Sequence, residues 1–514
     1  MINITRTIGS GEGTYLKKST AGYSTQLGLV VTLIAGSVGL GNIWRFPRIA
    51  AENGGGTFIV AWAIMMILVC LPIMLGEHSM GRATRHGLPG AFKDFIGKKY
   101  TWMGVVVVIT MFALNAYYGV LTGWVFYYLG LSITNSYAGA DKVELFDNIS
   151  NGNFTMVIIY VSLITIACYI AYKGIKGVEK VSKIFLPILF ISLAIVSIYS
   201  ITLPGAGAGL NYLFSFDPSL LLGSKIWLEA LTQAVWSAGA GWGLVITLAV
   251  FTRSRSDLSL TTSIQVAGDG VVALIAGMAV VPAVFAITPS IEAAQNILTQ
   301  DNFGLTFISL TNLFEQMPGG YIIGILFFLS LGLAAFSSVI ASVMIVVLPM
   351  ADSGIPKKKA VTWTYLILIV WGLPSVWNPS FLANQDWVVG QMMVFGAFLS
   401  CFALYKFGVS KVRKEFINNP YTGMSIGTWW EYSIKFIAPI IILIMFVWWS
   451  IQSIGWNEQW WNPFAPLSLG TLIMQGGLML LISIIFNNRI SDSIKEKHYT
   501  GEGFPGIPNN DYSD

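Results

Sequence analysis

Two short sequences place glycine and serine in the middle of long apolar stretches. Ser37-Val-Gly-Leu-Gly41 lies in the first stretch, Ser237-Ala-Gly-Ala-Gly241 lies in a later one, and both follow the pattern S-x-G-x-G. Glycine disfavours a helix by about 1 kcal/mol relative to alanine, so these glycines weaken each helix locally. Freed backbone carbonyls can ligate a cation, and freed N–H groups can bind a carboxylate. The two sequences therefore predict a binding site at broken helices.

Close helix packing is the alternative explanation for the same glycines. Small residues at this spacing in membrane helices often mark tight packing, and for either stretch alone we would favour it. Two breaks at corresponding places in two halves of a chain are instead typical of transporters built from inverted repeats. Unwound backbone at membrane depth is tolerated only where it is buried in protein or lines a watery cavity.

The composition is that of an integral membrane protein. Of 514 residues, 55% are apolar and 11% are charged, whereas a soluble domain is about 25% charged. About 20 apolar residues suffice to cross a membrane. We predict an all-α integral membrane protein with twelve transmembrane helices near residues 25–50, 57–80, 103–130, 154–172, 184–203, 227–251, 262–288, 319–350, 360–376, 387–405, 434–450 and 466–486.

The basic residues predict the orientation of these helices. Most of the 29 Lys and Arg fall in one set of alternating loops, for example Lys357–Lys359. Positive residues stay on the cytoplasmic side, so we expect both termini in the cytoplasm and the chain in the plasma or inner membrane. We expect a 5+5 inverted repeat: a cytoplasmic segment 1–24, a first repeat 25–203, a second repeat 204–407, two further helices within 408–488 and a cytoplasmic tail 489–514.

The remaining chemistry-bearing residues do not indicate an enzyme. The three cysteines and three histidines have no spacing typical of a disulfide framework, a metal site or a catalytic triad. The net charge of +4 follows from loop charge, so we expect no nucleic-acid partner.

Several segments resemble the neurotransmitter:sodium symporter family, and among its members prokaryotic amino-acid transporters. They are "GSVGLGNIWRFP", "AAENGGGTF", "GIKGVEKVSKIFLP", "TQAVWSAGAGWG" and "AAFSSVIAS". The resemblance runs from about Gly22 to Asp386 and, more weakly, through the last two helices. It implies a symporter that imports a neutral amino acid with sodium by alternating access.

The resemblance implies two Na⁺ sites. One, Na2, lies between the first and eighth helices and is formed by Ala35, Val38, Ala334, Ser337 and Ser338. An all-oxygen site suits a hard cation, although paired serines in a helix also bond back to their own carbonyls. The other site, Na1, is implied at Ser37, Asn42, Ser237 and Asp269, with the substrate carboxylate as a further ligand.

Asp269 is informative without the resemblance. It lies in the apolar sequence "IQVAGDGVVALIAGMAVVPAV", which has no Lys or Arg for a salt bridge. An ionisable residue inside a membrane costs a few kcal/mol unless it is paired or ligated, so Asp269 is a candidate functional residue.

The resemblance also implies a substrate site. The carboxylate is expected at the N–H groups around Leu40 and Gly41 and at the Tyr118 hydroxyl, and the ammonium at carbonyls of Ser37, Trp236 and Ser237. Monoamine-carrying relatives have an aspartate at the position of Gly39, so glycine favours a substrate that brings its own carboxylate. The expected pocket wall is Leu114, Trp236, Gly239, Trp242, Ser338 and Ser342. The small Gly239 increases the pocket volume and the large Trp242 reduces it, so the sequence does not determine the size of the substrate.

Two gates follow from the same resemblance. Arg45 and Asp386 are expected to pair on the outer side, above a lid of Tyr118 and Trp236. Asp352 is expected at the inner gate, where Lys17 or Lys18 takes the place of the family's basic residue. Glu77 and Arg82, in "GEHSMGR", are given no transport role because charges at loop ends are ordinarily solvated.

Chloride dependence is expected to be absent. The positions that hold Cl⁻ in many animal relatives correspond to Trp62, Gln233, Ser237 and Ala273, so two of the four anion ligands are missing. Asp269 can supply the negative charge instead, and on the sodium-free return it can carry a proton outward. A proton-coupled carrier, a substrate-gated channel and a non-transporting amino-acid sensor on the same scaffold are the alternatives.

Overall fold

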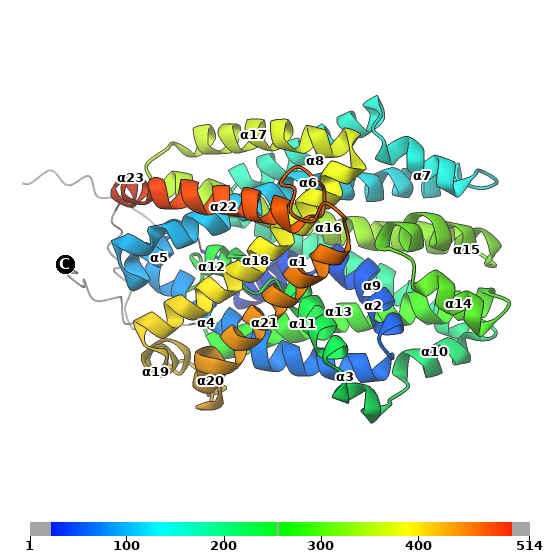
Figure 1. The fold of residues 1–514 in the computed structure, drawn as a ribbon, viewed down its shortest axis with the longest axis horizontal. Coiled ribbons are helices and arrows are strands. Elements are labelled where there is room, and N and C mark those ends of the chain that lie inside the picture. Colours follow the sequence, from blue (N-terminus) through cyan, green and yellow to red (C-terminus); the bar gives the residue numbers. More distant parts are fainter. Residues whose placement is uncertain (1–21, 254–255, 496–514) are drawn as a thin grey trace, which may run out of the picture.

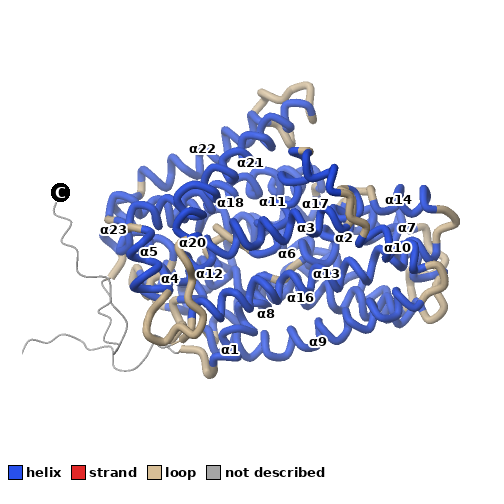
Figure 2. Tube along the Cα trace, turned by 90° about the horizontal axis from the view of Figure 1, so that it is seen from below, coloured by secondary structure: helices blue, strands red, loops and turns tan. Residues whose placement is uncertain are grey.

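The protein is a bundle of long, roughly parallel helices (Figures 1 and 2). The computed structural model describes residues 22–253 and 256–495, and within these ranges it contains helices and no β-strand. Nine helices of the described residues are long and apolar enough to cross a membrane, or up to eleven if each of two bent helix pairs is one span. The all-helical membrane fold is thus confirmed, whereas twelve spans and the inverted repeat stay predictions.

The nine spans agree with the apolar stretches of the sequence. Three are composite: α3 (Gly56–Met65) continues through a π-helical turn into α4 (Leu71–Thr84), α20 (Trp429–Tyr432) continues likewise into α21 (Ala438–Gln452), and a 3-10 turn (Lys98–Tyr100) leads into α6 (Thr101–Thr134). The others are α8 (Phe154–Tyr172), α9 (Ile175–Thr202), α13 (Leu258–Ile287), α16 (Gly320–Asp352), α17 (Lys357–Trp377) and α18 (Pro379–Phe407). One bent pair is α22 (Leu469–Ile485) with α23 (Asn487–Ser493).

The first helix is broken at the predicted place. α1 (Gln26–Ser37) ends at Ser37, and the chain resumes at Gly41 in a π-helical turn that leads into α2 (Phe46–Glu52). The two segments are bent by 60°. Val38 has extended backbone, which ends the helical hydrogen-bond pattern.

The other S-x-G-x-G sequence also breaks its helix. α11 (Ser224–Ala238) and α12 (Leu244–Ala249) are separated by residues 239–243. Gly239, Gly241 and Gly243 have φ of 74°, 84° and 72°. Only glycine adopts this left-handed region without strain, so the glycines allow the chain to leave the helix here.

Short helices close the two ends of the bundle. α7 (Lys142–Ser150), α10 (Ala206–Phe214), α14 (Ile291–Leu298) and α15 (Leu310–Gln316) gather at one end, which we name the outer end (Figures 1 and 2). α5 (Leu88–Ile96), α19 (Val409–Lys411) and α23 lie at the other, inner end. α16 packs between α6 and α9 in the centre, and α1 contacts α9, α13 and α16.

An ion pair joins two connections at the outer end. The buried Lys142 ammonium donates to Glu315 Oε2 at 2.6 Å and to the carbonyls of Tyr137 and Ala140. Glu315 Oε1 also accepts from the Gly139 N–H at 2.7 Å. The hydrogen bond from Lys142 holds the pKa of Glu315 below its ordinary value. The pair thus connects the start of α7 to the end of α15.

Replacing Glu315 by glutamine should destabilise the protein at neutral pH. Because the native pKa is lowered, the carboxylate stabilises the fold above the usual glutamate pKa of about 4.3 and loses this effect as the pH falls through the native value. We expect a loss of roughly 1 kcal/mol, since Glu315 is partly exposed. Thermal unfolding in detergent should show a deficit for Glu315→Gln at pH 7 that shrinks below pH about 4. Glu458→Gln, at an exposed acid, is the control; a pH-independent deficit would contradict the prediction.

Candidate functional site

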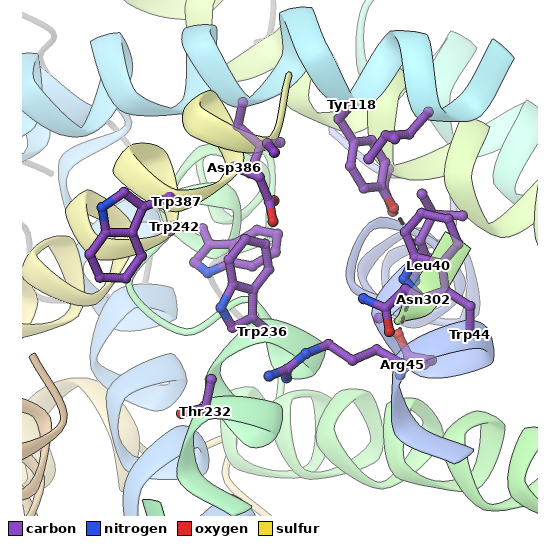
Figure 3. Close-up of a pocket in the computed structure, with 18 of the residues that line it drawn as sticks. Leu40, Trp44, Arg45, Tyr118, Thr232, Trp236, Trp242, Asn302, Asp386 and Trp387 are labelled. Atoms are coloured by element: carbon purple, nitrogen blue, oxygen red, sulfur yellow. Dashed lines mark hydrogen bonds between the residues drawn. The ribbon is translucent and has the colours of Figure 1, made fainter. Parts of the chain in front are cut away.

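A cavity of about 430 Å³ lies beside the break in the first helix (Figure 3). Its walls come from the break, α6, α11, α16 and α18. A volume of this size is typical of a small-molecule site. Residues expected in the substrate site or outer gate that line it are Ser37, Leu40, Gly41, Leu114, Tyr118, Trp236, Trp242, Ser338, Ser342, Arg45 and Asp386. Ser237 and Gly239 are buried next to the lining residues but are not among them.

The break exposes a backbone donor where a carboxylate is expected. The Leu40 N–H donates to the Tyr118 hydroxyl at 2.9 Å, so these two groups meet at the cavity wall (Figure 3). A Cβ atom at Gly39 would lie 2.7 Å from the Tyr118 hydroxyl and 3.2 Å from Ser338 Oγ. The glycine therefore keeps this corner open for a ligand.

The side chains expected at Na1 form one buried cluster. Asn42 Nδ2 donates to Ser237 Oγ at 2.7 Å and to Asp269 Oδ1 at 2.8 Å, and Ser237 Oγ donates to Asp269 Oδ2 at 2.5 Å. Gln265 Nε2 donates to Ser37 Oγ at 2.7 Å, which ties the end of α1 to α13. Asp269 is fully buried and has no cation among its described partners.

Two of the residues expected at Na2, Ser338 and Val38, are in contact across the helices. Ser338 Oγ donates across the helices to the Val38 carbonyl at 2.9 Å. Ser337 Oγ donates to the Ala334 carbonyl at 2.9 Å, which is the back-bonding that serines make in their own helix. Ala35 is buried one turn before Val38. The atoms expected to bind the ion here are all oxygens, which fits a hard cation such as Na⁺. Among the described residues there is no group of His, Cys, Asp and Glu that could hold a metal ion.

The outer gate residues face the same cavity without pairing. Arg45 Nη1 donates to Gln233 Oε1 at 2.8 Å, and Asp386 Oδ1 accepts from the Tyr117 hydroxyl at 2.9 Å. In Figure 3 the Trp236 ring lies between the Arg45 guanidinium and Asp386. Arg45 and Asp386 are therefore not paired with each other in this structure, and the expected ion pair stays a prediction.

Several hydrogen bonds join separate segments at the inner end. Asp352 Oδ2 accepts from the Gly87 N–H at 2.6 Å. The buried Tyr23 donates to the Leu248 carbonyl at 3.3 Å, and Arg253 donates to the Ser24 carbonyl at 2.9 Å. Lys17 and Lys18, the expected partners of Asp352, lie outside the described residues.

Glu77 was missed by the sequence interpretation. It is buried, it accepts from Ser400 Oγ at 2.8 Å, and its other oxygen lies 3.4 Å from the Gly241 N–H in the break after α11. It is thus a carboxylate against the freed backbone of that break, where we expected a solvated loop-end charge. The signal that could have found it is the acid in the otherwise apolar "VCLPIMLGEHSMG". Arg82 is buried too and donates to the Ser256 and Phe416 carbonyls, which is a structural role.

A helical membrane protein with a broken helix beside a cavity of this size has the features of a secondary transporter. The sequence profile of the Sodium:neurotransmitter symporter family matches residues 21–148 and 140–492. The chain belongs to this family of sodium-dependent transporters, as the sequence motifs predicted. The family and its structural neighbours are transporters, not enzymes.

Individual relatives agree with this assignment. An uncharacterized sodium-dependent transporter of Methanocaldococcus jannaschii is 27% identical over 446 residues, which are 82% of this chain and 88% of the relative. The uncharacterized sodium-dependent transporter YhdH of Bacillus subtilis is also 27% identical over 446 residues, 83% of this chain and 96% of YhdH. The crystal structure of MhsT in complex with L-phenylalanine matches with a TM-score of 0.74 and 29% identity, covering 84% of this chain and 99% of MhsT.

Gly39→Asp should abolish amino-acid binding, and Gly39→Asn should weaken it far less. Both side chains crowd Tyr118, but only aspartate places a second carboxylate near the position expected for the carboxylate of the substrate. Like charges about 4 Å apart repel by about 4 kcal/mol at an effective dielectric of 20, which is roughly a thousandfold in affinity. Binding of radiolabelled amino acid in sodium buffer measures the affinity of each variant. Equal affinities of the two variants would show that the carboxylate binds elsewhere.

Ser338→Ala should raise the sodium concentration needed for half-maximal substrate binding by about tenfold, the effect of losing about 1.4 kcal/mol. At saturating sodium the substrate affinity should change less than the sodium dependence, because the lost hydroxyl is an expected ion ligand, although Ser338 also lines the cavity. Ser330→Ala is the matched control, since Ser330 is buried in the same helix and its hydroxyl donates to the Leu326 carbonyl of that helix. A sodium dependence shared by wild type, Ser330→Ala and Ser338→Ala would remove Ser338 from the site.

Proposed function

We propose that the protein is a sodium-coupled symporter that imports a neutral α-amino acid by alternating access. The observation that carries this proposal is the break at Ser37–Gly41. It presents the Leu40 N–H and the Tyr118 hydroxyl to the cavity and lies within hydrogen-bond distance of two clusters of oxygen ligands. Such a site can hold a carboxylate and cations together. The relative MhsT, whose crystal structure contains L-phenylalanine, supports an amino acid as the substrate class.

The proposed substrate has one carboxylate and an ammonium group. The carboxylate would take the Leu40 N–H and the Tyr118 hydroxyl, which in the structure satisfy each other. The ammonium would meet carbonyls of Ser37, Trp236 and Ser237. An extra acid at position 39, which a monoamine would need, is absent because this residue is glycine.

Two Na⁺ ions are proposed. Na1 would use the Asn42–Ser237–Asp269 cluster with the Ser37 carbonyl, and Na2 would use Ser337, Ser338 and carbonyls of Ala35, Val38 and Ala334. The ions would supply the driving force. One charge crossing 100 mV contributes about 2.3 kcal/mol, and a tenfold gradient adds about 1.4 kcal/mol. Two ions thus provide roughly 7 kcal/mol, enough for about a 10⁵-fold substrate gradient.

Transport is proposed to be independent of chloride, and the contacts of the corresponding residues support this. Gln233 Nε2 donates to the Gly41 carbonyl at 2.9 Å, and Ser237 Oγ donates to Asp269 at 2.5 Å. These donors are therefore occupied within the protein. Asp269 supplies the negative charge beside Na1, and a proton on Asp269 would neutralise it after sodium leaves. Outward proton transport on the return step is part of the proposal.

The proposed setting is the plasma or inner membrane, with both termini cytoplasmic and twelve spans in two inverted repeats. The break between α11 and α12 supports this arrangement because it repeats the break between α1 and Gly41. If α11 and α12 together count as one further span, the up to eleven candidate spans become twelve. The end that carries α7, α10, α14 and α15 would then face the outside.

Sodium-driven uptake of radiolabelled neutral amino acids into proteoliposomes tests the proposal. We expect accumulation above the external concentration that needs a sodium gradient, persists when gluconate replaces chloride and increases with an acidic lumen. A channel would only equilibrate the amino acid, and a sensor would bind it without uptake. Asp269→Ala should lose uptake in either buffer, whereas chloride should partly rescue Asp269→Ser. Full activity of Asp269→Ala without chloride, or a wild-type requirement for chloride, would contradict this role.

A further inference from the structure

Arg45 faces two acids on opposite sides of the cavity. Its Nη2 lies 3.9 Å from Glu229 Oε2 on α11, and its Nη1 donates to Gln233 Oε1, one helical turn further along the same helix face. Asp386 on α18 stands on the other side and accepts from Tyr117. Arg45 therefore contacts α11 in this open arrangement, and a closed gate requires it to leave this contact.

The two acids differ in their surroundings. Asp386 is exposed to the cavity, so water can solvate its charge. Glu229 is 9% exposed, and its Oε2 has no hydrogen bond among the described residues. A buried carboxylate is costly without a positive partner. Among the described residues, Arg45 forms the ion pair with Glu229, whereas Asp386 accepts a hydrogen bond from Tyr117.

Gln233 links this contact to the binding site. Its carbonyl oxygen accepts from Arg45, and its Nε2 donates to the Gly41 carbonyl at the end of the break. Arg45 itself follows Gly41 by four residues in the same π-helical turn. Gln233 therefore contacts both Arg45 and the backbone that we propose binds substrate and Na⁺.

We propose that Glu229 is a positioning residue that holds the outer gate open by competing with Asp386 for Arg45. This inference rests on the proposed function, because it concerns the gate of that transport cycle. Closure transfers Arg45 to Asp386 and leaves Glu229 buried without its partner. The resulting penalty keeps the cavity open until substrate and sodium contribute contacts that outweigh it. Removal of the Glu229 charge then favours the closed gate even without substrate.

A cysteine at Ala383 reports the open state. Ala383 lines the cavity on α18, and the native Cys70, Cys168 and Cys401 are buried, so the protein without Ala383→Cys gives the background. The full chain in proteoliposomes is treated with a membrane-impermeant, cationic methanethiosulfonate in sodium buffer, and the labelling rate is measured with and without amino acid. Labelling needs no transport, so the result is separate from the uptake test.

Without amino acid, Glu229→Gln should slow labelling about tenfold, which corresponds to about 1.4 kcal/mol. Glu52→Gln removes an equal charge at the same end, where Glu52 pairs with Arg48 and Lys225, and should leave the rate unchanged. Glu229→Asp should restore most of the parent rate. Asp386→Asn should keep labelling fast even with amino acid, since Arg45 then lacks its closed-state partner.

Equal rates for Glu229→Gln and Glu52→Gln would overturn the proposal. If Glu229→Gln does not fold, the Asp386→Asn variant provides the test. The proposal would also be overturned if amino acid slowed the labelling of Asp386→Asn as much as it slows that of the parent. Absence of uptake by the wild type together with the expected labelling pattern would contradict the symporter and leave the role of Glu229 intact. Uptake by the wild type, together with unchanged labelling of Glu229→Gln, would support the symporter and contradict the role of Glu229.

Discussion

The break between Ser37 and Gly41 places unpaired backbone groups inside a membrane-spanning helix, and the surrounding polar contacts satisfy them. An unsatisfied N–H or carbonyl at this depth costs several kcal/mol. The Leu40 N–H donates to Tyr118, the Gly39 N–H donates to Asn42 Oδ1 at 3.0 Å, and the Gly41 carbonyl accepts from Gln233. Each partner can be exchanged for a ligand of matching polarity. The requirement to satisfy the break thus creates the site.

The backbone groups freed by the break after α11 have different partners. Left-handed glycines turn the chain, and Glu77 on α4 lies against the Gly241 N–H while Ser400 on α18 donates to its other oxygen. This carboxylate lies toward the inner side of the break, whereas Asp269 lies beside Ser237 before it. Both acids are buried next to freed backbone. A buried carboxyl group therefore lies beside each broken helix.

The sequence allowed the breaks and the main side chains to be predicted because their signals are local. Glycines within an S-x-G-x-G pattern weaken a helix wherever it packs, and Asp269 stands out as a charge in an apolar helix. The site residues themselves came from the family resemblance. Glu77 was misjudged because its position near the end of an apolar stretch hides its burial. The contact between Arg45 and Gln233 joins residues 188 apart, and sequence periodicity does not determine contacts between such distant residues.

The contacts across the break also indicate how ligands could bias the conformation. Val38, Leu40 and Asn42 in the broken helix bond to Ser338 on α16, Tyr118 on α6 and Asp269 on α13, three helices that continue past the break. The first two are neutral hydrogen bonds. A cation or carboxylate inserted there would replace them by charge-assisted contacts, which are roughly twice as strong. Because a ligand shifts an equilibrium only through its different affinity for the two states, the state that keeps the broken helix against these three helices is the one that ligands would favour.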